Sequence, residues 1–118
     1  MTLPPIQLDP RFAAAVDDFN RGEYAEANDL FEELFFEAAG DELDFARTFL
    51  QVSVGFLHAD QGQRRPAIER LEEGLLTVDR VTNDRGVDLV RLRCEVVVAI
   101  AALRAGEAVS SPMIAIRG

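Results

Sequence analysis

The sequence predicts an all-α protein, a single-domain bundle of about five helices spanning residues 1–118. Apolar residues recur at three- and four-residue intervals along most of the chain, which is the helical period. Cap residues and glycines bound these segments, and the joints between them are short. With 118 residues and 48% hydrophobic side chains, the chain can fill one core without a disulfide or a metal. We expect residues 1–8 to form an N-terminal extension and residues 106–118 an extended C-terminal tail.

The first two helices are predicted from their caps and apolar faces. The first begins at Asp9-Pro10, because Asp is a good N-cap and the first turn does not need the N–H that Pro lacks. Its apolar face consists of Phe12, Ala15, Val16 and Phe19. Arg21-Gly22 ends it, and the second helix is expected to end at Gly40. The second apolar stripe consists of Tyr24, Ala27, Phe31, Leu34, Phe35 and Ala38. Because the joint is short, the two helices should pack antiparallel.

The third helix, expected at residues 42–60, is apolar on two sides, and such a helix is normally enclosed by its neighbours. One apolar line consists of Phe45, Phe49, Val52 and Phe56. The other consists of Leu43, Leu50, Val54 and Leu57. A polar thread runs between them and consists of Arg47, Gln51 and His58. We therefore expect this helix at the centre of the bundle.

The fourth helix, expected at residues 64–81, has one inward face, which consists of Ala67, Leu71, Leu75 and Val78. Asn83-Asp84 indicates a turn before the fifth helix, expected at residues 85–105. One stripe of the fifth helix consists of Val87, Val90, Cys94, Val97 and Ala101. The other consists of Leu89, Leu92, Val96, Ile100 and Leu103. Two apolar faces on a late helix require a second partner, either another subunit or the tail.

A small-then-large pattern recurs after 40 residues. Gly22, Ala27, Phe31 and Leu34 are echoed by Gly62, Ala67, Leu71 and Gly74. A small residue lets two helices approach closely, and the bulky residue one turn on fills the groove between them. The echo predicts antiparallel helix pairs similar to those of tetratricopeptide repeats.

The composition favours a cytoplasmic protein and argues against two classes of partner. Twelve basic residues stand against 21 acidic ones, and a net charge of −9 gives no electrostatic grip on nucleic acid or an anionic membrane. The lone Cys94 excludes an internal disulfide, fits a reducing compartment and is expected to be a small core residue. Residues 1–8 lack the pattern of a signal peptide, and the most apolar stretch, residues 94–103, is too short to span a bilayer.

Polar residues at the edge of the second helix are the candidates for chemistry. Asn28 and Glu32 lie one turn apart on this edge, and Asp29 points further outward. If the second and third helices pack together, Asn28 and Glu32 would face the polar thread. The predicted polar cluster consists of Asn28, Glu32, Arg47, Gln51 and His58. Its carboxylate, amide and imidazole groups could orient a substrate, hold a metal or relay a proton.

Two segments carry a family resemblance. Residues 19–24 read Phe-Asn-Arg-Gly-Glu-Tyr and lead into Ala27, Phe31 and Glu32, and residues 51–62 contain Gln51 and His58 at matching positions. Over roughly residues 19–75 the chain resembles the DUF309 family, small all-helical proteins of unknown function, some of which are labelled predicted metal-dependent hydrolases. The resemblance implies a site in which Glu32 and His58 are the catalytic candidates. It also implies Asp29, Glu32 and His58 as candidate ligands of a divalent metal such as Mn²⁺ or Mg²⁺.

The departures from the family pattern weaken that site. Asn28 stands where the first His of a family His-Glu pair is expected, and Asp29 stands where the Glu is expected. Phe35 replaces a Trp, and Arg47 replaces a Gln. Because Asn neither titrates near neutrality nor serves as a strong zinc ligand, one of two imidazoles is lost.

Each candidate also has a structural interpretation. His58 could bond Glu32 or a backbone carbonyl, Glu32 could pair with Arg47 across the two helices, and Gln51 and Asn28 could bond each other. We therefore rank a helical interaction or scaffold module, forming a homodimer through the fifth helix or the tail, ahead of a metal-dependent hydrolase-like protein. The residues themselves predict no cofactor.

Overall fold

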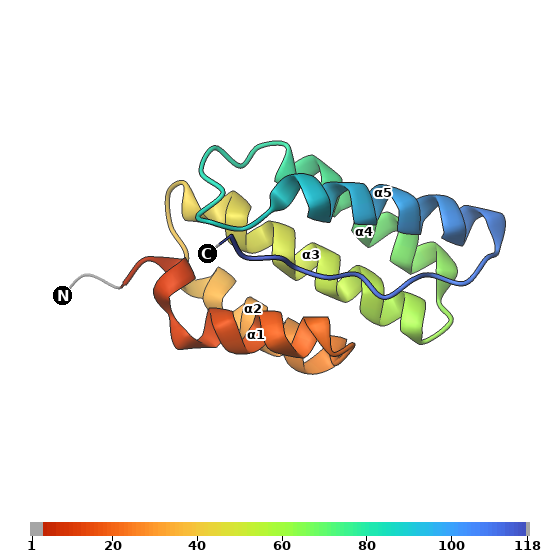
Figure 1. Ribbon diagram of the computed structural model, residues 1–118, viewed down its shortest axis with the longest axis horizontal. Helices are drawn as coiled ribbons and strands as arrows, with labels where there is room; N and C mark the ends of the chain where they lie inside the picture. The colour runs from red at the N-terminus through yellow and green to blue at the C-terminus, as the bar shows by residue number, and fades with distance from the viewer. Residues whose placement is uncertain (1–3, 118) are drawn as a thin grey trace.

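The computed structural model of the chain describes residues 4–117, which form one 3₁₀ turn and five α-helices (Figure 1). They are η1 (Ile6–Leu8), α1 (Pro10–Asn20), α2 (Tyr24–Glu37), α3 (Glu42–Asp60), α4 (Arg64–Val78) and α5 (Leu89–Ala105). The all-α prediction is confirmed. Residues 1–3 of the expected extension and Gly118 of the expected tail lie outside the described residues. Within residues 4–117, no helix combines the length and apolarity needed to cross a membrane.

Helix α3 lies in the middle of the bundle, between the α1–α2 pair and helices α4 and α5 (Figure 1). Its first predicted apolar line is buried and consists of Phe45, Phe49, Val52 and Phe56. Its second line is only half-buried and consists of Leu43, Leu50, Val54 and Leu57. The helix is therefore fully enclosed on one side and partly covered on the other.

The joints after α1 and α3 share one geometry. Gly22 (φ 78°) and Gly62 (φ 75°) both take the left-handed conformation that glycine adopts at low cost. In the helix that follows each joint, Ala27 and Ala67 have no exposed surface, so the paired helices approach closely there. The predicted 40-residue echo is therefore a repeated helix–turn–helix unit.

The same turn occurs a third time, after α5, but no helix follows it within the part of the chain that the structure describes. Gly106 has φ 72°, and the next N–H, of Glu107, donates to the Ala102 carbonyl at 2.8 Å. From there residues 107–117 run back between α5 and α1 in an extended conformation (Figure 1). Ile114 in this tail is only 3% exposed. Among residues 4–117, α5 is therefore followed by an extended segment where α1 and α3 are followed by an antiparallel helix.

The start of α5 was predicted four residues too early. Arg85 (φ 52°) and Gly86 (φ 85°) take left-handed conformations that a helix cannot contain. Asp88 is the actual N-cap, and its Oδ1 accepts the Arg91 N–H at 3.0 Å. Helix α2 ends at Glu37, before Gly40, and α4 ends at Val78 rather than 81, so these two helices were predicted slightly too long, whereas the predicted ends of α3 and α5 agree with the structure.

The prediction that Cys94 is a core residue is wrong, because Cys94 is exposed. It belongs to the first α5 stripe, and only Val87 of that stripe is buried. The helical period shows that α5 has two apolar faces, but it cannot show which one the rest of the molecule covers.

Candidate functional site

The antiparallel packing of α2 and α3 separates Glu32 from His58, the two catalytic candidates of the predicted polar cluster. The ring of Phe31 on α2 stacks on the ring of Phe49 on α3, with centroids 5.4 Å apart. Glu32, the next residue, is therefore level with Phe49 along α3. His58 lies nine residues further along α3, which corresponds to about 14 Å of helix. The two catalytic candidates thus lie at different levels of the helix pair.

Asn28 and His58 bond to partners outside the predicted cluster. Asn28 Oδ1 accepts a long hydrogen bond of 3.5 Å from the buried Ser53 hydroxyl. His58 Nδ1 lies 2.6 Å from Gln63 Oε1, five residues along the chain. His58 is thus bonded to its own turn. The structural interpretation in which His58 bonds Glu32 is therefore wrong.

Arg47 does not form the expected ion pair with Glu32. Its Nη1 lies 3.8 Å from Asp44 Oδ1 on its own helix, and its guanidinium lies over the Phe35 ring, 5.4 Å from the centroid. Gln51 accepts a 3.4 Å bond from an arginine of α4 and not from Asn28. The polar thread therefore stabilises helix packing at separate points.

The candidate metal ligands do not fit a metal site in this arrangement. Asp29 and Glu32 are exposed on α2, and His58 is half-buried at the end of α3. Among the described residues, no three His, Cys, Asp or Glu side chains gather where one ion could bind them. Metal binding remains a prediction from the family resemblance alone.

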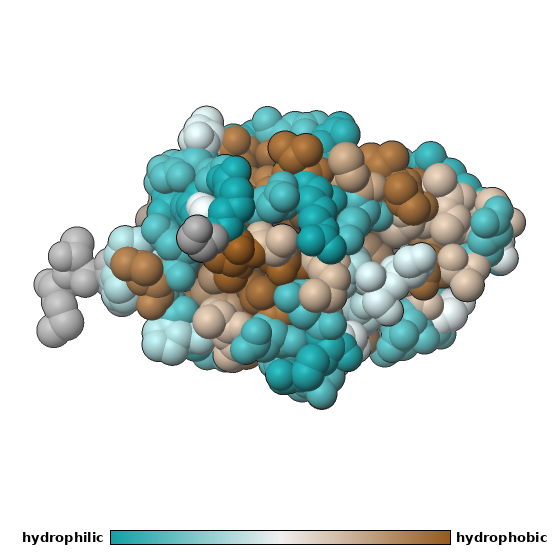
Figure 2. Space-filling model, in the orientation of Figure 1, coloured by the Kyte–Doolittle hydropathy of each residue, from teal (hydrophilic) through white to brown (hydrophobic). Residues whose placement is uncertain are grey.

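The outward side of α5 is a second candidate surface. Val90, Cys94, Val97 and Ala101 recur at intervals of four, three and four residues and are all exposed. Val90 is 77% exposed and Val98, beside them, is 64% exposed. We call these five residues the α5 face. Figure 2 shows hydrophobic side chains along this upper edge of the molecule.

A third candidate is the groove that holds the tail, and Asn20 at the end of α1 is central to it. Asn20 Oδ1 accepts the Ile114 N–H at 2.7 Å, and Asn20 Nδ2 donates to the Ile114 carbonyl at 3.0 Å. Glu95 Oε2 on α5 accepts the Met113 N–H at 2.8 Å. The groove thus holds the tail through its main chain, with bonds that do not depend on the tail's side chains.

The segment before α5 extends this pairing. Val87 and Ile116 form an isolated antiparallel bridge. The Arg117 guanidinium forms an ion pair with the Asp84 carboxylate. A hydrogen bond from the Gly86 N–H, assisted by Arg117, holds the pKa of Asp84 below its usual value. The end of the tail is therefore bound both by its main chain and by charge.

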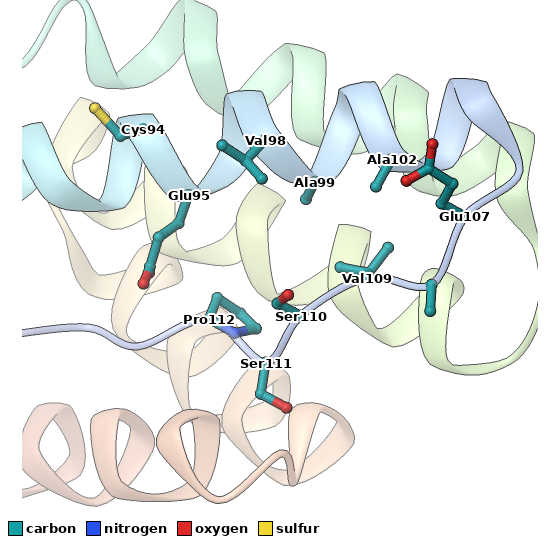
Figure 3. A pocket seen from close by; sticks show the side chains of 11 residues that line it. Cys94, Glu95, Val98, Ala99, Ala102, Glu107, Val109, Ser110, Ser111 and Pro112 are labelled. Atoms are coloured by element: carbon teal, nitrogen blue, oxygen red, sulfur yellow. The ribbon is translucent and has the colours of Figure 1, made fainter.

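Two cavities flank the tail where it leaves α5. One of about 350 Å³ lies between the tail and α5 (Figure 3). Its α5 wall includes Glu95, Ala99 and Ala102, and Cys94 and Val98 of the α5 face also border it. The other, of about 250 Å³, lies on the side of Tyr24 and Phe56. Ser110 and Ser111 border both cavities and point to opposite sides of the tail (Figure 3). Their small side chains leave both volumes open.

Tyr24 should titrate above its ordinary value. Burial raises the pKa of its hydroxyl above 10.0, and the Asp60 and Glu95 carboxylates add to this effect. Because the folded state prefers the protonated phenol, stability should be unchanged well below pH 10 and should fall as the pH rises past 10 toward the folded pKa.

The measurement is direct, since Tyr24 is the only tyrosine and the chain has no tryptophan. An absorbance titration of the folded chain should give a midpoint above 10.0 that returns to about 10 in urea. A folded midpoint at or below the urea value would contradict the burial argument.

The sequence reasoning did not find Asn20 or Glu95 as functional candidates. Asn20 lies in the segment that carries the family resemblance, but its role depends on Ile114, 94 residues away. Glu95 is the only acidic residue of α5, but its position in the helix does not indicate that it meets the tail. No local pattern distinguishes either residue.

The comparisons with known proteins give one match. Residues 12–69 match a family model described as "Domain of unknown function (DUF309)". No curated protein and no solved structure matches the chain.

Proposed function

We propose, from the premise that the chain belongs to the DUF309 family, that it is a small helical interaction module that forms a homodimer through the α5 face. One observation carries the proposal. Helix α5 ends in the same turn as α1 and α3, but its apolar stripe faces solvent and is covered by no other helix of residues 4–117. Exposed apolar surface of this kind is typical of interaction sites.

The rim of the α5 face suits a second copy of the same chain. Arg93 pairs with Asp79, and Arg104 pairs with Glu72, both at 2.9 Å. On the other side Arg91 lies 3.6 Å from Glu95. Because each of these arginines is paired with a carboxylate of its own chain, the rim carries little net charge. Two copies can therefore meet here with little electrostatic repulsion. Elsewhere, copies with a net charge of −9 repel each other.

A stable dimer needs a larger apolar surface than the α5 face alone. Stable interfaces bury about 800 Å² on each side, which is more than one narrow stripe provides. Leu76 of α4 is 55% exposed and lies between Glu72 and Asp79, the two residues that pair with α5. It therefore extends the apolar surface beside the helix. The small side chains of Cys94 and Ala101 favour a close helix–helix approach.

Val90→Arg should abolish the dimer. Light scattering across a concentration series should give twice the chain mass of 13.0 kDa for the natural chain and 13.0 kDa for the variant. A charge buried without a partner at such a contact is strongly unfavourable. Cys94 supplies a second readout, because dimerisation should slow its reaction with a thiol reagent as the concentration rises.

Leu8→Arg is the matched control, since Leu8 is 69% exposed and lies on η1. It should leave both the mass and the thiol reactivity unchanged. A natural chain that remains a monomer at every concentration contradicts the proposal. A dimer that survives Val90→Arg also contradicts it.

A further inference from the structure

The tail shows what kind of ligand its groove accepts. Residues 107–117 are extended, and Asn20 bonds both the N–H and the carbonyl of Ile114. These are the two bonds that a neighbouring β-strand would make to one residue. Since both involve the main chain, any extended segment in the same register could form them.

Side-chain selection in the groove comes from two alternate positions. Pro112 and Ile114 are buried, whereas Met113 between them is exposed. An extended chain places alternate side chains on opposite sides, so two inward positions separated by one outward position are expected. The groove therefore selects small or branched apolar residues at these two positions.

The groove also has a charge preference. Asp84 pairs with Arg117 at one end, and Glu95 lies midway and accepts the Met113 N–H. The chain as a whole carries a net charge of −9. An extended segment with a basic residue after the apolar positions complements these carboxylates.

The tail is an incomplete occupant of this groove. Cavities of about 350 Å³ and 250 Å³ lie on its two sides, bordered by Ser110 and Ser111. Their walls include the apolar side chains of Val98, Phe56 and Leu103. A ligand with a larger apolar residue at either serine position would bury surface that the tail leaves exposed.

We infer that this groove is a binding site for an extended peptide segment of a partner protein that carries a basic residue after its apolar positions and displaces the chain's own tail. The ligand carries apolar residues at the positions of Pro112 and Ile114 and larger apolar residues at those of Ser110 and Ser111. The tail of a second copy has the same small residues and would leave the same cavities open. A foreign segment can fill them and so overcome the advantage of a tethered competitor.

The probe is a labelled peptide with the sequence of residues 107–117, in which Ser110 is replaced by Leu. The full chain carries Ile114→Asp to release its tail, and Val90→Arg to keep it monomeric. Fluorescence anisotropy should show binding at least tenfold tighter to this chain than to one with Val90→Arg alone. The same peptide with serine retained should bind about tenfold more weakly, because a buried leucine adds apolar contact.

Two matched controls separate specific binding from adhesion. Adding Asn20→Ala to the released chain should weaken binding at least tenfold, because the ligand loses both main-chain bonds. A probe with Asp in place of Ile114 should not bind. Rising salt should weaken binding of the intact probe, since its arginine faces Asp84.

The natural chain provides a second measurement if the released chain does not fold. A saturating concentration of the leucine peptide should accelerate hydrogen exchange at the Met113 and Ile114 amides, both of which are bonded in the groove. Failure to bind the folded released chain, or unchanged exchange in the natural chain, overturns the inference. A dimer that is lost with Ile114→Asp but kept with Val90→Arg would show that a second copy is the occupant, and that result overturns it as well. Because binding is read on a monomer, its failure is distinct from failure of the dimer.

Discussion

Phe49→Ala should lower the free energy of unfolding by about 3–5 kcal/mol, the largest effect expected of a single substitution in this chain. Phe49 is 1% exposed on the central helix α3. Its ring lies within 5.4 Å, centroid to centroid, of the rings of Phe12, Phe31 and Phe45. These come from α1, α2 and α3, so the cavity would open where three helices meet.

Urea unfolding followed by circular dichroism measures this difference. The control is Phe36→Ala, which removes the same atoms from a residue that is 76% exposed on α2. Its effect should stay within about 0.5 kcal/mol. Equal losses at the two positions would contradict the packing that places Phe49 at the centre.

Arg85→Met should lower the free energy of unfolding by about 2 kcal/mol, which is somewhat less than the loss of a fully buried ion pair. The Arg85 side chain is 8% exposed and lies 3.2 Å from Asp41 and 3.4 Å from Glu42. Its Nη1 also donates to Gln7 Oε1 at 3.2 Å. Since Asp41 is 62% exposed, water would compensate part of the loss. The Arg85 guanidinium also lies over the Phe45 ring, 5.8 Å from its centroid, so Met removes this contact together with the ion pairs and keeps only an apolar stem.

Arg65→Met is the control for the charge itself. Arg65 is 91% exposed and lies 3.7 Å from Glu69 on the same helix. Its loss should change the free energy of unfolding by less than about 0.5 kcal/mol. If Arg85→Met has an equally small effect, the link that joins η1, the α2–α3 joint and the α4–α5 segment is energetically unimportant.

The fold was largely predictable because most of its signals are local. The α3 bounds at residues 42 and 60 agree with prediction, since Gly40 and Gly62 punctuate the chain on either side. The α5 start was not predictable in the same way. Arg85 adopts a left-handed conformation that side chains other than glycine rarely take, and its ion pairs with Asp41 and Glu42 hold it there.

The candidate sites were less predictable than the fold. Glu32 and His58 each lie near the edge of an apolar stripe, but the antiparallel register of α2 and α3 separates them along the helix axis. Cys94 has the spacing of a core residue and yet faces solvent. In both cases the residue pattern was correctly identified, but its neighbours could not be inferred from it.

The sequence by itself determined the helices, the Asp9 cap of α1 and the repeated turn with its buried alanine. These depend on contacts three or four residues apart and on the conformational freedom of glycine, which any stretch of chain carries within itself. Only the tertiary structure decided that the tail covers one side of α5 and leaves the α5 face exposed. It also decided that Asn20 holds Ile114, because that contact joins residues 94 positions apart. Local sequence preferences do not determine a contact between residues so far apart, which forms only when the whole chain packs.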